Sequence, residues 1–348
     1  MGIKSNHFNA LESMRGLAAL MVILFHLNSH WPGHLAVDFF FMLSGFILTH
    51  TYHFQKPDTT KRDFILARFI RLYPLHIFTL AAYTIAYLLI KSEIPAPETN
   101  LISTLAQQLT LTHNIGLNKD LGLLLWNYPS WSISVEFWVS LIFILLIGKN
   151  TPSLYLMGLS AVCFIFIALN FHHLNVHYMN IYSVINMGLL RGLASFLLGI
   201  VAYRVFHRYK NLPDIKHATL YETLCIAMLS LIVFLRPEPK FITDFLAPPL
   251  FFVMIILFAF EQGRLSSGLK DIRYLGTISY SIYLNQMLVI LVCTFCFEKF
   301  SLSNNNMIFA ILVTVIIYSH LTYRYIEYPM KSFLSLRLLP SQKEKIND

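Results

Sequence analysis

Charged residues are scarce in this sequence. Only 13% of its 348 residues are Asp, Glu, Lys or Arg, and 56% are hydrophobic, whereas about 25% of a soluble globular protein is charged. The mean hydropathy is +0.59. So few charges cannot cover so much apolar surface in water, and the apolar residues form long runs rather than narrow stripes. A soluble fold is therefore excluded.

Several other features are absent or few. The four cysteines, Cys163, Cys225, Cys293 and Cys296, all lie in apolar runs, so they indicate neither a disulfide framework nor a redox compartment. There is no phosphate-binding glycine loop and no dinucleotide fingerprint. We find no low-complexity tract, no internal repeat and no appended soluble domain. We therefore expect residues 1–348 to form a single membrane domain.

Ten apolar runs are long enough to cross a bilayer, which needs about 20 residues per helix. The sequence thus predicts an all-α, polytopic transmembrane helical bundle. The first run carries Arg15, lacks a small-residue cleavage site and is followed at once by a second run, so it is not predicted to be a cleaved signal peptide. The ten runs are 10–30, 36–54, 70–90, 131–148, 154–171, 182–203, 218–235, 243–260, 274–297 and 306–325.

The distribution of basic residues predicts the orientation. The net charge is +8, but the basic residues lie in short segments between apolar runs and not on one solvated face, so nucleic acid is not an expected partner. With the N-terminus inside, 20 of the 26 Lys and Arg residues fall on the cytoplasmic side. Both termini are therefore predicted to be cytoplasmic. Residues 91–130 are interpreted as an outer interfacial helix or a re-entrant pair, with an even number of crossings.

Ionisable residues within the first two runs are costly in a bilayer and need a partner, a cavity or a function. Arg15 and His26 are eleven residues apart, so on a helix they share a face about 16 Å apart. The alternative is a snorkelling Arg and a structural His. Asp38 has the predicted depth of His26, where a carboxylate would orient the imidazole. Its alternative is an interfacial carboxylate wetted by loop water.

Two later runs also carry ionisable residues. Ser132 and Glu136 share a helix face, and a carboxylate so far inside an apolar run must be paired or protonated, which favours a functional role. Arg191 is central in its run and needs a counter-ion, for which Glu136 is a candidate. A structural ion pair explains Arg191 equally well.

Arg68 and Arg71 begin the third predicted span. Three residues apart, they point the same way on a helix, and two guanidinium groups suit phosphate because Arg donates in a bidentate, planar manner. Positive-inside anchoring on lipid headgroups explains them as well and is favoured by these residues alone.

The weaker signals concern metal binding and redox chemistry. His173 and His177 form an i, i+4 pair next to His172 that could bind zinc. No carboxylate or cysteine lies near in the sequence, so we favour a wet outer loop and predict no metal site. Cys293 and Cys296 are most simply interpreted as packing residues.

Together these segments resemble the acyltransferase 3 family of integral-membrane acyltransferases, which includes bacterial enzymes that O-acetylate surface polysaccharides. The resemblance covers nearly the whole chain. It rests on the Arg15 to His26 spacing, the run Val37 to Phe46, the segment Arg68 to Pro74, the motif Ser132 to Glu136, the stretch from Arg191 through Phe196 to Gly199, the segment Ser279 to Leu284, and Glu327-Tyr328-Pro329.

The resemblance implies transfer of an acyl group, with acetyl expected, from cytoplasmic acyl-CoA to a hydroxyl of a surface polysaccharide or lipid-linked glycan. Acyl-CoA would be a co-substrate, no permanently bound cofactor is implied, and the protein would lie among the lipids of the bacterial inner membrane. Residue by residue, the implied catalytic positions are His26 and Glu136. The implied acyl-CoA-binding residues are Arg15, Arg68 and Arg71, and the supporting residues are Asp38, Ser132 and Arg191.

One position departs from the family pattern. Where members commonly have His after the Tyr-Leu pair, this chain has Asn285 and Gln286. Gln cannot titrate, so a proton-transfer role there is lost or moved. Two other function classes stay open. A transporter or flippase would use the same charges, although no broken-helix pair in matching halves supports it. A non-catalytic scaffold is favoured only by Gln286.

Overall fold

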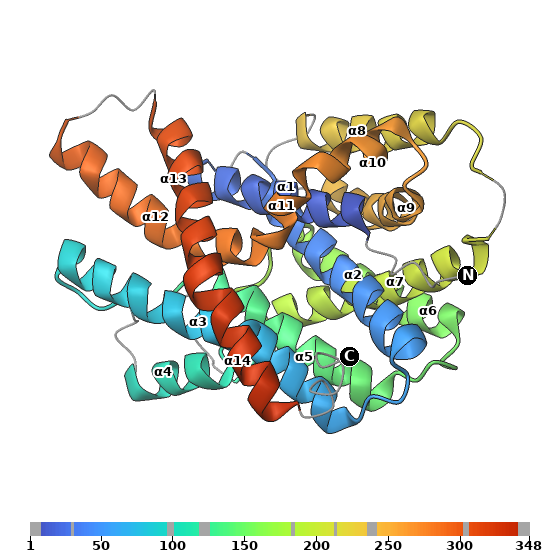
Figure 1. Ribbon diagram of the computed structural model, residues 1–348, viewed down its shortest axis with the longest axis horizontal. Helices are drawn as coiled ribbons and strands as arrows, with labels where there is room; N and C mark the ends of the chain where they lie inside the picture. Colours follow the sequence, from blue (N-terminus) through green and yellow to red (C-terminus); the bar gives the residue numbers. More distant parts are fainter. Residues whose placement is uncertain are drawn as a thin grey trace. The chain divides into compact units, whose positions relative to one another are not determined.

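Helices account for nearly all the regular structure in the computed structural model (Figure 1). The structure describes residues 8–28, 31–95, 101–117, 126–181, 185–211, 214–234, 242–301 and 306–339. Within these ranges the β structure is one antiparallel pair, β1 (Asn180–Ile181) with β2 (Ile185–Asn186). The prediction of an all-α fold is confirmed.

Long apolar helices occur where the sequence predicts spans. Among the described residues, eight helices have the length and hydropathy to cross a membrane. The helices Ser130–Leu146 and Ala218–Phe234 are apolar but shorter. The protein is therefore an integral membrane protein. The number of crossings and the location of the termini stay predictions. The eight candidate spans are Asn9–Leu27, Gly33–Gln55, Lys61–Lys91, Ser153–Phe171, Met187–Tyr209, Thr243–Phe260, Ser279–Lys299 and Met307–Leu338.

Three helices begin at other residues than the predicted spans. α3 (Lys61–Lys91) begins nine residues before the predicted 70, because the Thr60 Oγ1 accepts a hydrogen bond from the Asp63 N–H at 3.1 Å and caps the helix. α7 (Met187–Tyr209) begins after 182 because the strand pair occupies 185–186. The run from 274 is broken, since α11 (Arg273–Thr277) ends before α12 (Ser279–Lys299) begins.

The chain divides into two compact units, each made of three segments. The first comprises Met1–Phe54, Pro152–Asn175 and Leu193–Ser279, and the second comprises Gln55–Thr151, Val176–Gly192 and Tyr280–Asp348. Helix α7 contributes residues to both units.

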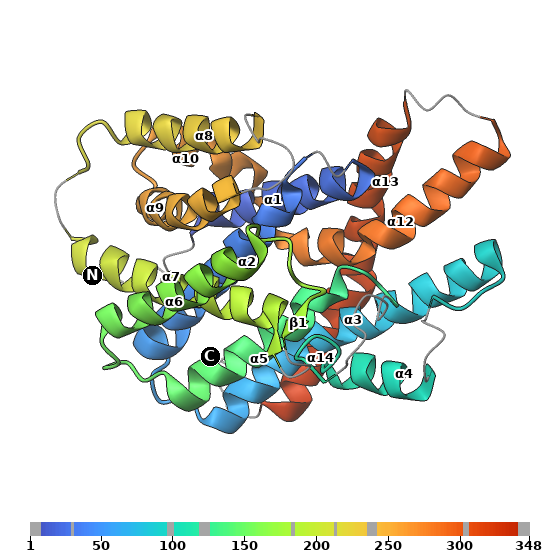
Figure 2. The same cartoon turned by 180° about the vertical axis from the view of Figure 1, so that it is seen from behind.

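The first unit is built around α1 (Asn9–Leu27), which packs against α11 and α2 (Ala36–Leu48). Both views show α8 (Ala218–Phe234) alongside α9 (Ala247–Phe260) (Figures 1 and 2). The remaining elements of this unit are η1 (Gly33–Leu35), the π-helix η2 (Thr49–Gln55), α6 (Ser153–Phe171), η4 (Ile242–Leu246), α10 (Arg264–Leu269) and η5 (Lys270–Ile272).

Glycines allow two close helix approaches in the first unit. A Cβ on Gly199 of α7 would overlap the Met42 carbonyl oxygen, and one on Gly45 of α2 would overlap the Phe196 carbonyl oxygen. A Cβ on Gly16 of α1 would likewise meet the Leu275 backbone. Small residues at such positions let helix backbones meet directly, which drives association where lipid is as apolar as the side chains.

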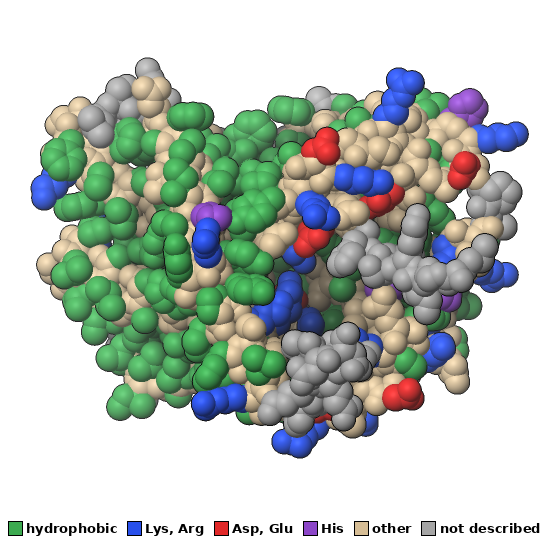
Figure 3. Space-filling view, in the orientation of Figure 1, with side chains coloured by type: hydrophobic (Ala, Val, Ile, Leu, Met, Phe, Trp, Pro, Cys, Tyr) green, Lys and Arg blue, Asp and Glu red, His purple; other side chains and the backbone are tan. Residues whose placement is uncertain are grey.

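The second unit is centred on α3, which contacts α5 (Ser130–Leu146), α14 (Tyr328–Leu338) and the π-helix η7 (Tyr323–Glu327). It also contains α4 (Leu101–Thr110), α12 and α13 (Met307–Thr322). In Figure 3, hydrophobic side chains cover much of the visible surface of α12 and α13. Phe309 of α13 is 72% exposed. Such a surface suits contact with lipid.

The segment 91–130 holds one short helix in its described part. α4 has ten residues, about half the number needed to cross the hydrocarbon core. Its Thr104 and Gln108 are buried while Ile102 is 81% exposed. This amphipathic pattern fits the interfacial-helix interpretation, and residues 96–100 and 118–125 lie outside the described ranges.

The close approach of α7 to α2 leads to a stability prediction. Replacing Gly199 with Ala should destabilise the fold by roughly 1–3 kcal/mol, because overpacking forces a backbone shift. Thermal unfolding in detergent measures the effect. The matched control is Gly158→Ala on α6, where a Cβ would meet nothing within 4 Å. Equal melting temperatures for the two variants would contradict the prediction.

Candidate functional site

Arg15 joins α1 to the junction of α11 and α12. Its Nε donates to the Ser279 Oγ at 2.9 Å and its NH2 donates to the Gly276 carbonyl at 2.7 Å. The same NH2 lies 3.6 Å from the Glu12 carboxylate. Because Gly276 is in the last turn of α11, the cation also complements the negative end of that helix. Arg15 is therefore held by protein contacts, and the snorkelling interpretation does not describe it.

His26 lies in the last turn of α1 and is partly buried. The Phe25 ring is 5.3 Å from the His26 ring and 5.4 Å from the His34 ring. The direction of the α1 helix thus places the candidate base three turns from Arg15, as the spacing predicts. The helix ends at Leu27, so His26 lies next to the C-terminal end of α1.

A second histidine and carboxylate pair lies beside Phe25. The His34 Nε2 is 3.0 Å from the Asp244 Oδ2, and both residues are buried. The same carboxylate oxygen accepts the Leu174 N–H at 3.1 Å. The sequence analysis missed this pair. Asp244 was an available signal, because it is an acidic residue inside the predicted span 243–260.

Asp38 is fully buried on the first turn of α2. The Ser195 Oγ of α7 donates to its Oδ1 at 2.8 Å. The interpretation of Asp38 as a carboxylate wetted by loop water was therefore wrong, because the side chain is fully buried and accepts a hydrogen bond from α7. Its pairing with His26 stays a prediction.

In the second unit, Ser132, Glu136 and Arg191 all act on Tyr283 of α12. The Ser132 Oγ donates to the Tyr283 hydroxyl at 2.8 Å. The charges of Glu136 and Arg191 act electrostatically on that hydroxyl. Arg191 is fully buried and Tyr283 is 5% exposed. That Glu136 is the counter-ion of Arg191 stays a prediction.

Tyr280, one turn earlier on α12, connects to α3. Its hydroxyl donates to the Leu72 carbonyl at 2.6 Å. Arg71, Glu136 and Glu327 act electrostatically on the same hydroxyl. Arg71 is thus a partly buried residue inside α3, ten residues after the helix begins, and its place at the cytoplasmic entrance of the span stays a prediction.

Arg68 lies one turn before Arg71 on α3. Its guanidinium is 5.9 Å from the centre of the Phe64 ring. Arg68 and Arg71 therefore keep the shared helical direction that the spacing predicts. The phosphate-binding role of the two residues stays a prediction.

The first turns of α12 form a buried polar segment. The Ser281 Oγ donates to the Glu327 Oε2 at 2.7 Å, and the Asn285 Nδ2 donates to the Thr322 Oγ1 at 2.7 Å. Gln286 is fully buried and its Nε2 donates to the Tyr283 carbonyl at 2.8 Å. Among the described residues, its Oε1 has no hydrogen-bond partner. The family His position is therefore a buried site occupied by an amide.

Two further buried polar groups adjoin α5 outside the candidate spans. The His113 Nε2 lies 3.0 Å from the Ser130 carbonyl, and its ring stacks on His76 with centroids 6.0 Å apart. Burial and the neighbouring His76 lower the pKa of His113 to about 3. Burial raises the pKa of Tyr128 to about 12, so the Tyr128 hydroxyl stays protonated and can donate to the His177 Nε2 at 2.8 Å.

The histidines at 172, 173 and 177 are predicted to lie in a solvent-exposed outer loop, but their exposure in the structure differs from one to another. His172 is exposed, but His177 is 4% exposed and stacks on Trp131 with ring centroids 4.5 Å apart. The prediction was wrong for His177 because an indole ring covers it, a contact that the local sequence does not reveal. In the described part of the chain, no group of three or more His, Cys, Asp or Glu is placed to hold a metal ion.

Comparison with known proteins identifies the family. The family model described as "Acyltransferase domain", that of acyltransferase 3, matches residues 8–323. The chain belongs to the acyltransferase 3 family. Every site residue named from the sequence lies within the matched range, as do Tyr280, Tyr283 and Gln286. No solved structure matches this chain.

Three relatives differ in their sequence identity to this acyltransferase 3 chain and in the length that aligns with it. "Protein 2 in picA locus" of Rhizobium radiobacter is 41% identical over 81 residues, 21% of this chain and 42% of the relative. A Staphylococcus aureus protein named as an O-acetyltransferase is 35% identical over 95 residues, 26% of this chain and 16% of the relative. The peptidoglycan O-acetyltransferase of Listeria monocytogenes is 24% identical over 354 residues, 92% of this chain and 55% of the relative. The chain thus spans about half or less of these relatives.

The buried His113 leads to a prediction on acid stability. Above pH 3 the folded acyltransferase 3 chain keeps His113 neutral, whereas an unfolded His binds a proton near pH 6.5. The unfolded state therefore gains a proton that the folded state lacks, and the free energy of unfolding falls as the pH drops below about 6.5. In His113→Gln, the melting temperature should fall less between pH 7 and pH 5 than in the wild type.

The readout is the pH dependence of the melting temperature in detergent, since the lost hydrogen bonds of His113→Gln shift its absolute value. His172→Asn, which alters an exposed His, is the control and should keep the wild-type dependence. An unchanged dependence in His113→Gln would contradict a neutral, buried His113.

Proposed function

We propose that this protein is a membrane O-acyltransferase that moves an acyl group, acetyl in the simplest case, from cytoplasmic acyl-CoA to a hydroxyl of a surface polysaccharide or lipid-linked glycan. The family match across residues 8–323 carries the proposal. It is supported by relatives named as O-acetyltransferases, one of which is named for peptidoglycan. We place the enzyme in the bacterial inner membrane.

His26 is the proposed base. Its neutral imidazole accepts the proton of the acceptor hydroxyl as the oxygen attacks the thioester carbonyl carbon. The new C–O bond forms, the C–S bond breaks, and the proton passes from the imidazolium to the departing CoA thiolate. Transfer is either direct or proceeds through an acyl group carried on the imidazole, in which case CoA is released before the acceptor is added. The proposed role of His26 is supported by its position one residue before the C-terminal end of α1.

Arg68 and Arg71 are the proposed phosphate-binding residues for acyl-CoA. Two guanidinium groups on one helix face match a polyanionic nucleotide. Arg15 is proposed to organise the donor site through its hydrogen bonds to Gly276 and Ser279, which hold the α11–α12 junction. The structure thus favours an organising role for Arg15 over direct phosphate binding, since its guanidinium is already engaged.

Glu136 and Ser132 are proposed as the second set of required residues. Both act on Tyr283, which Arg191 also approaches. In this proposal the Tyr283 hydroxyl donates a hydrogen bond to an oxygen that gains negative charge. Asp38 is proposed as a supporting residue, because its bond to Ser195 joins α2 to α7.

The first test of the proposal is His26→Ala. Purified protein incubated with labelled acetyl-CoA should lose acyl transfer by at least about 100-fold, the usual contribution of a general base. Expression and membrane insertion should remain. The control is His172→Ala, which removes an exposed imidazole. Wild-type turnover in His26→Ala would remove this residue from the mechanism.

The second test separates donor binding from lipid anchoring. In the double variant Arg68→Ala/Arg71→Ala, the KM for acetyl-CoA should rise at least about tenfold, because charge-assisted hydrogen bonds to phosphate are lost. Lys61→Ala/Arg62→Ala removes the same charge from the exposed start of α3 and should leave the KM unchanged. Equal KM values with reduced abundance of the first variant would support lipid anchoring and sink the donor-binding role.

A further inference from the structure

An apolar cavity of about 480 Å³ lies within the first unit, and neither of the proposed catalytic residues lines it. Helices α1, α2, α8, α9 and α10 line it. Its volume falls in the range of small-molecule sites, about 300–1,000 Å³. Neither the acyl-transfer chemistry nor the family resemblance assigns it a ligand.

The cavity follows one face of α1. Met14, Leu17, Ala18 and Met21 line it at the i, i+3, i+4 and i+7 positions of this helix. At 1.5 Å per residue, these positions extend over about 10 Å. One leaflet of the hydrocarbon core is about 15 Å thick. The cavity therefore fits within a single leaflet and has the apolar lining expected for part of one lipid chain.

One end of the cavity carries a positive charge. Arg264, at the start of α10, is the charged residue among those that line it. The sequence places this end on the cytoplasmic side, where anionic lipids give the leaflet its negative surface potential. A guanidinium there suits the phosphate of a lipid headgroup.

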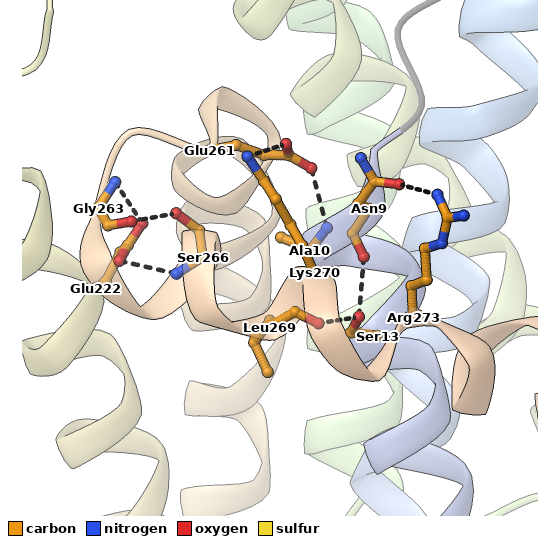
Figure 4. A network of polar contacts seen from close by, with 10 residues as sticks. All are labelled: Asn9, Ala10, Ser13, Glu222, Glu261, Gly263, Ser266, Leu269, Lys270 and Arg273. Carbon is orange, nitrogen blue, oxygen red and sulfur yellow. Dashed lines mark hydrogen bonds and ion pairs between the residues drawn. The ribbon is translucent and has the colours of Figure 1, made fainter.

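A polar network holds α10 in place at this end (Figure 4). The buried Glu222 carboxylate accepts the Gly263, Leu265 and Ser266 N–H groups at 3.1–3.2 Å. The Ser13 Oγ of α1 donates to the Leu269 carbonyl at 2.5 Å. These contacts fix both ends of α10, and Leu265 and Leu269 line the cavity.

Two carboxylates of this network are directed at donors other than the Arg264 guanidinium. The Glu222 charge is directed at three backbone N–H groups, and Glu261 pairs with Lys270 at 2.9 Å while also accepting the Ala10 N–H at 3.0 Å. Figure 4 shows both carboxylates turned toward these donors.

We propose that this cavity binds one hydrocarbon chain of an anionic phospholipid from the cytoplasmic leaflet, with the headgroup phosphate at Arg264. The bound lipid would fill the space between α1, α8 and α9 and tie α10 to the membrane surface. This site is independent of acyl transfer, so its test does not depend on the proposed enzyme activity.

Native mass spectrometry of the purified full-length chain tests the proposal. The protein is incubated with equal amounts of phosphatidylglycerol and phosphatidylcholine of identical chains. One lipid should be retained per chain, with phosphatidylglycerol preferred about fivefold, the effect of one basic residue at an anionic surface. Loss of all lipid from the wild type, or equal retention of the two lipids, would overturn the proposal.

Variants separate the headgroup from the chain. Arg264→Ala should abolish the preference and Arg264→Lys should keep part of it, and both alter an exposed side chain. Ala18→Phe fills the cavity and should reduce retention of both lipids. The controls are Lys216→Ala and Ala161→Phe, at exposed positions outside the cavity. Equal losses in the controls and the test variants would show lipid binding to the general surface and refute the site.

Discussion

The absence of water from the bilayer core is the constraint on which this structure depends. A polar group left without a partner in hydrocarbon costs several kcal/mol, so a buried polar side chain that bonds to another segment stabilises the packing of the two. Asp38 accepts a hydrogen bond from the Ser195 hydroxyl, Arg15 donates to Gly276 and Ser279, and Tyr280 donates to Leu72. These contacts join helices that are far apart in the sequence, and Arg15 and Asp38, which are proposed to organise and support the site, are among them.

Close backbone contact follows from the same environment. Lipid offers no hydrophobic driving force between apolar helices, so packing depends on small residues and on polar contacts. Gly45 and Gly199 bring α2 and α7 together at the level where Asp38 meets Ser195. Gly16 brings α1 against the short helix α11. Arg15 of α1 then donates to the Gly276 carbonyl of α11. The glycines thus set the distances that the polar contacts require.

Much of the fold and part of the candidate site were predictable. Long apolar runs mark membrane helices because burial in lipid depends on composition over about 20 residues. The first and last residues of those helices were harder to predict from the sequence. The cap at Thr60 and the break between α11 and α12 depend on single residues and tertiary contacts. The His34–Asp244 pair and the buried position of His177 were missed for a similar reason, because each depends on a partner distant in the sequence.

The sequence by itself determined the class of the protein, the helices available to it and the few ionisable residues worth considering, because hydropathy and residue spacing are local properties. Only the tertiary structure decided which partners those residues have: that Arg15 is engaged by α11, that Asp38 is buried against α7, and that Ser132 donates to Tyr283. The physical reason is that hydrogen bonds and ion pairs act over a few ångströms, and only folding brings distant segments within that range.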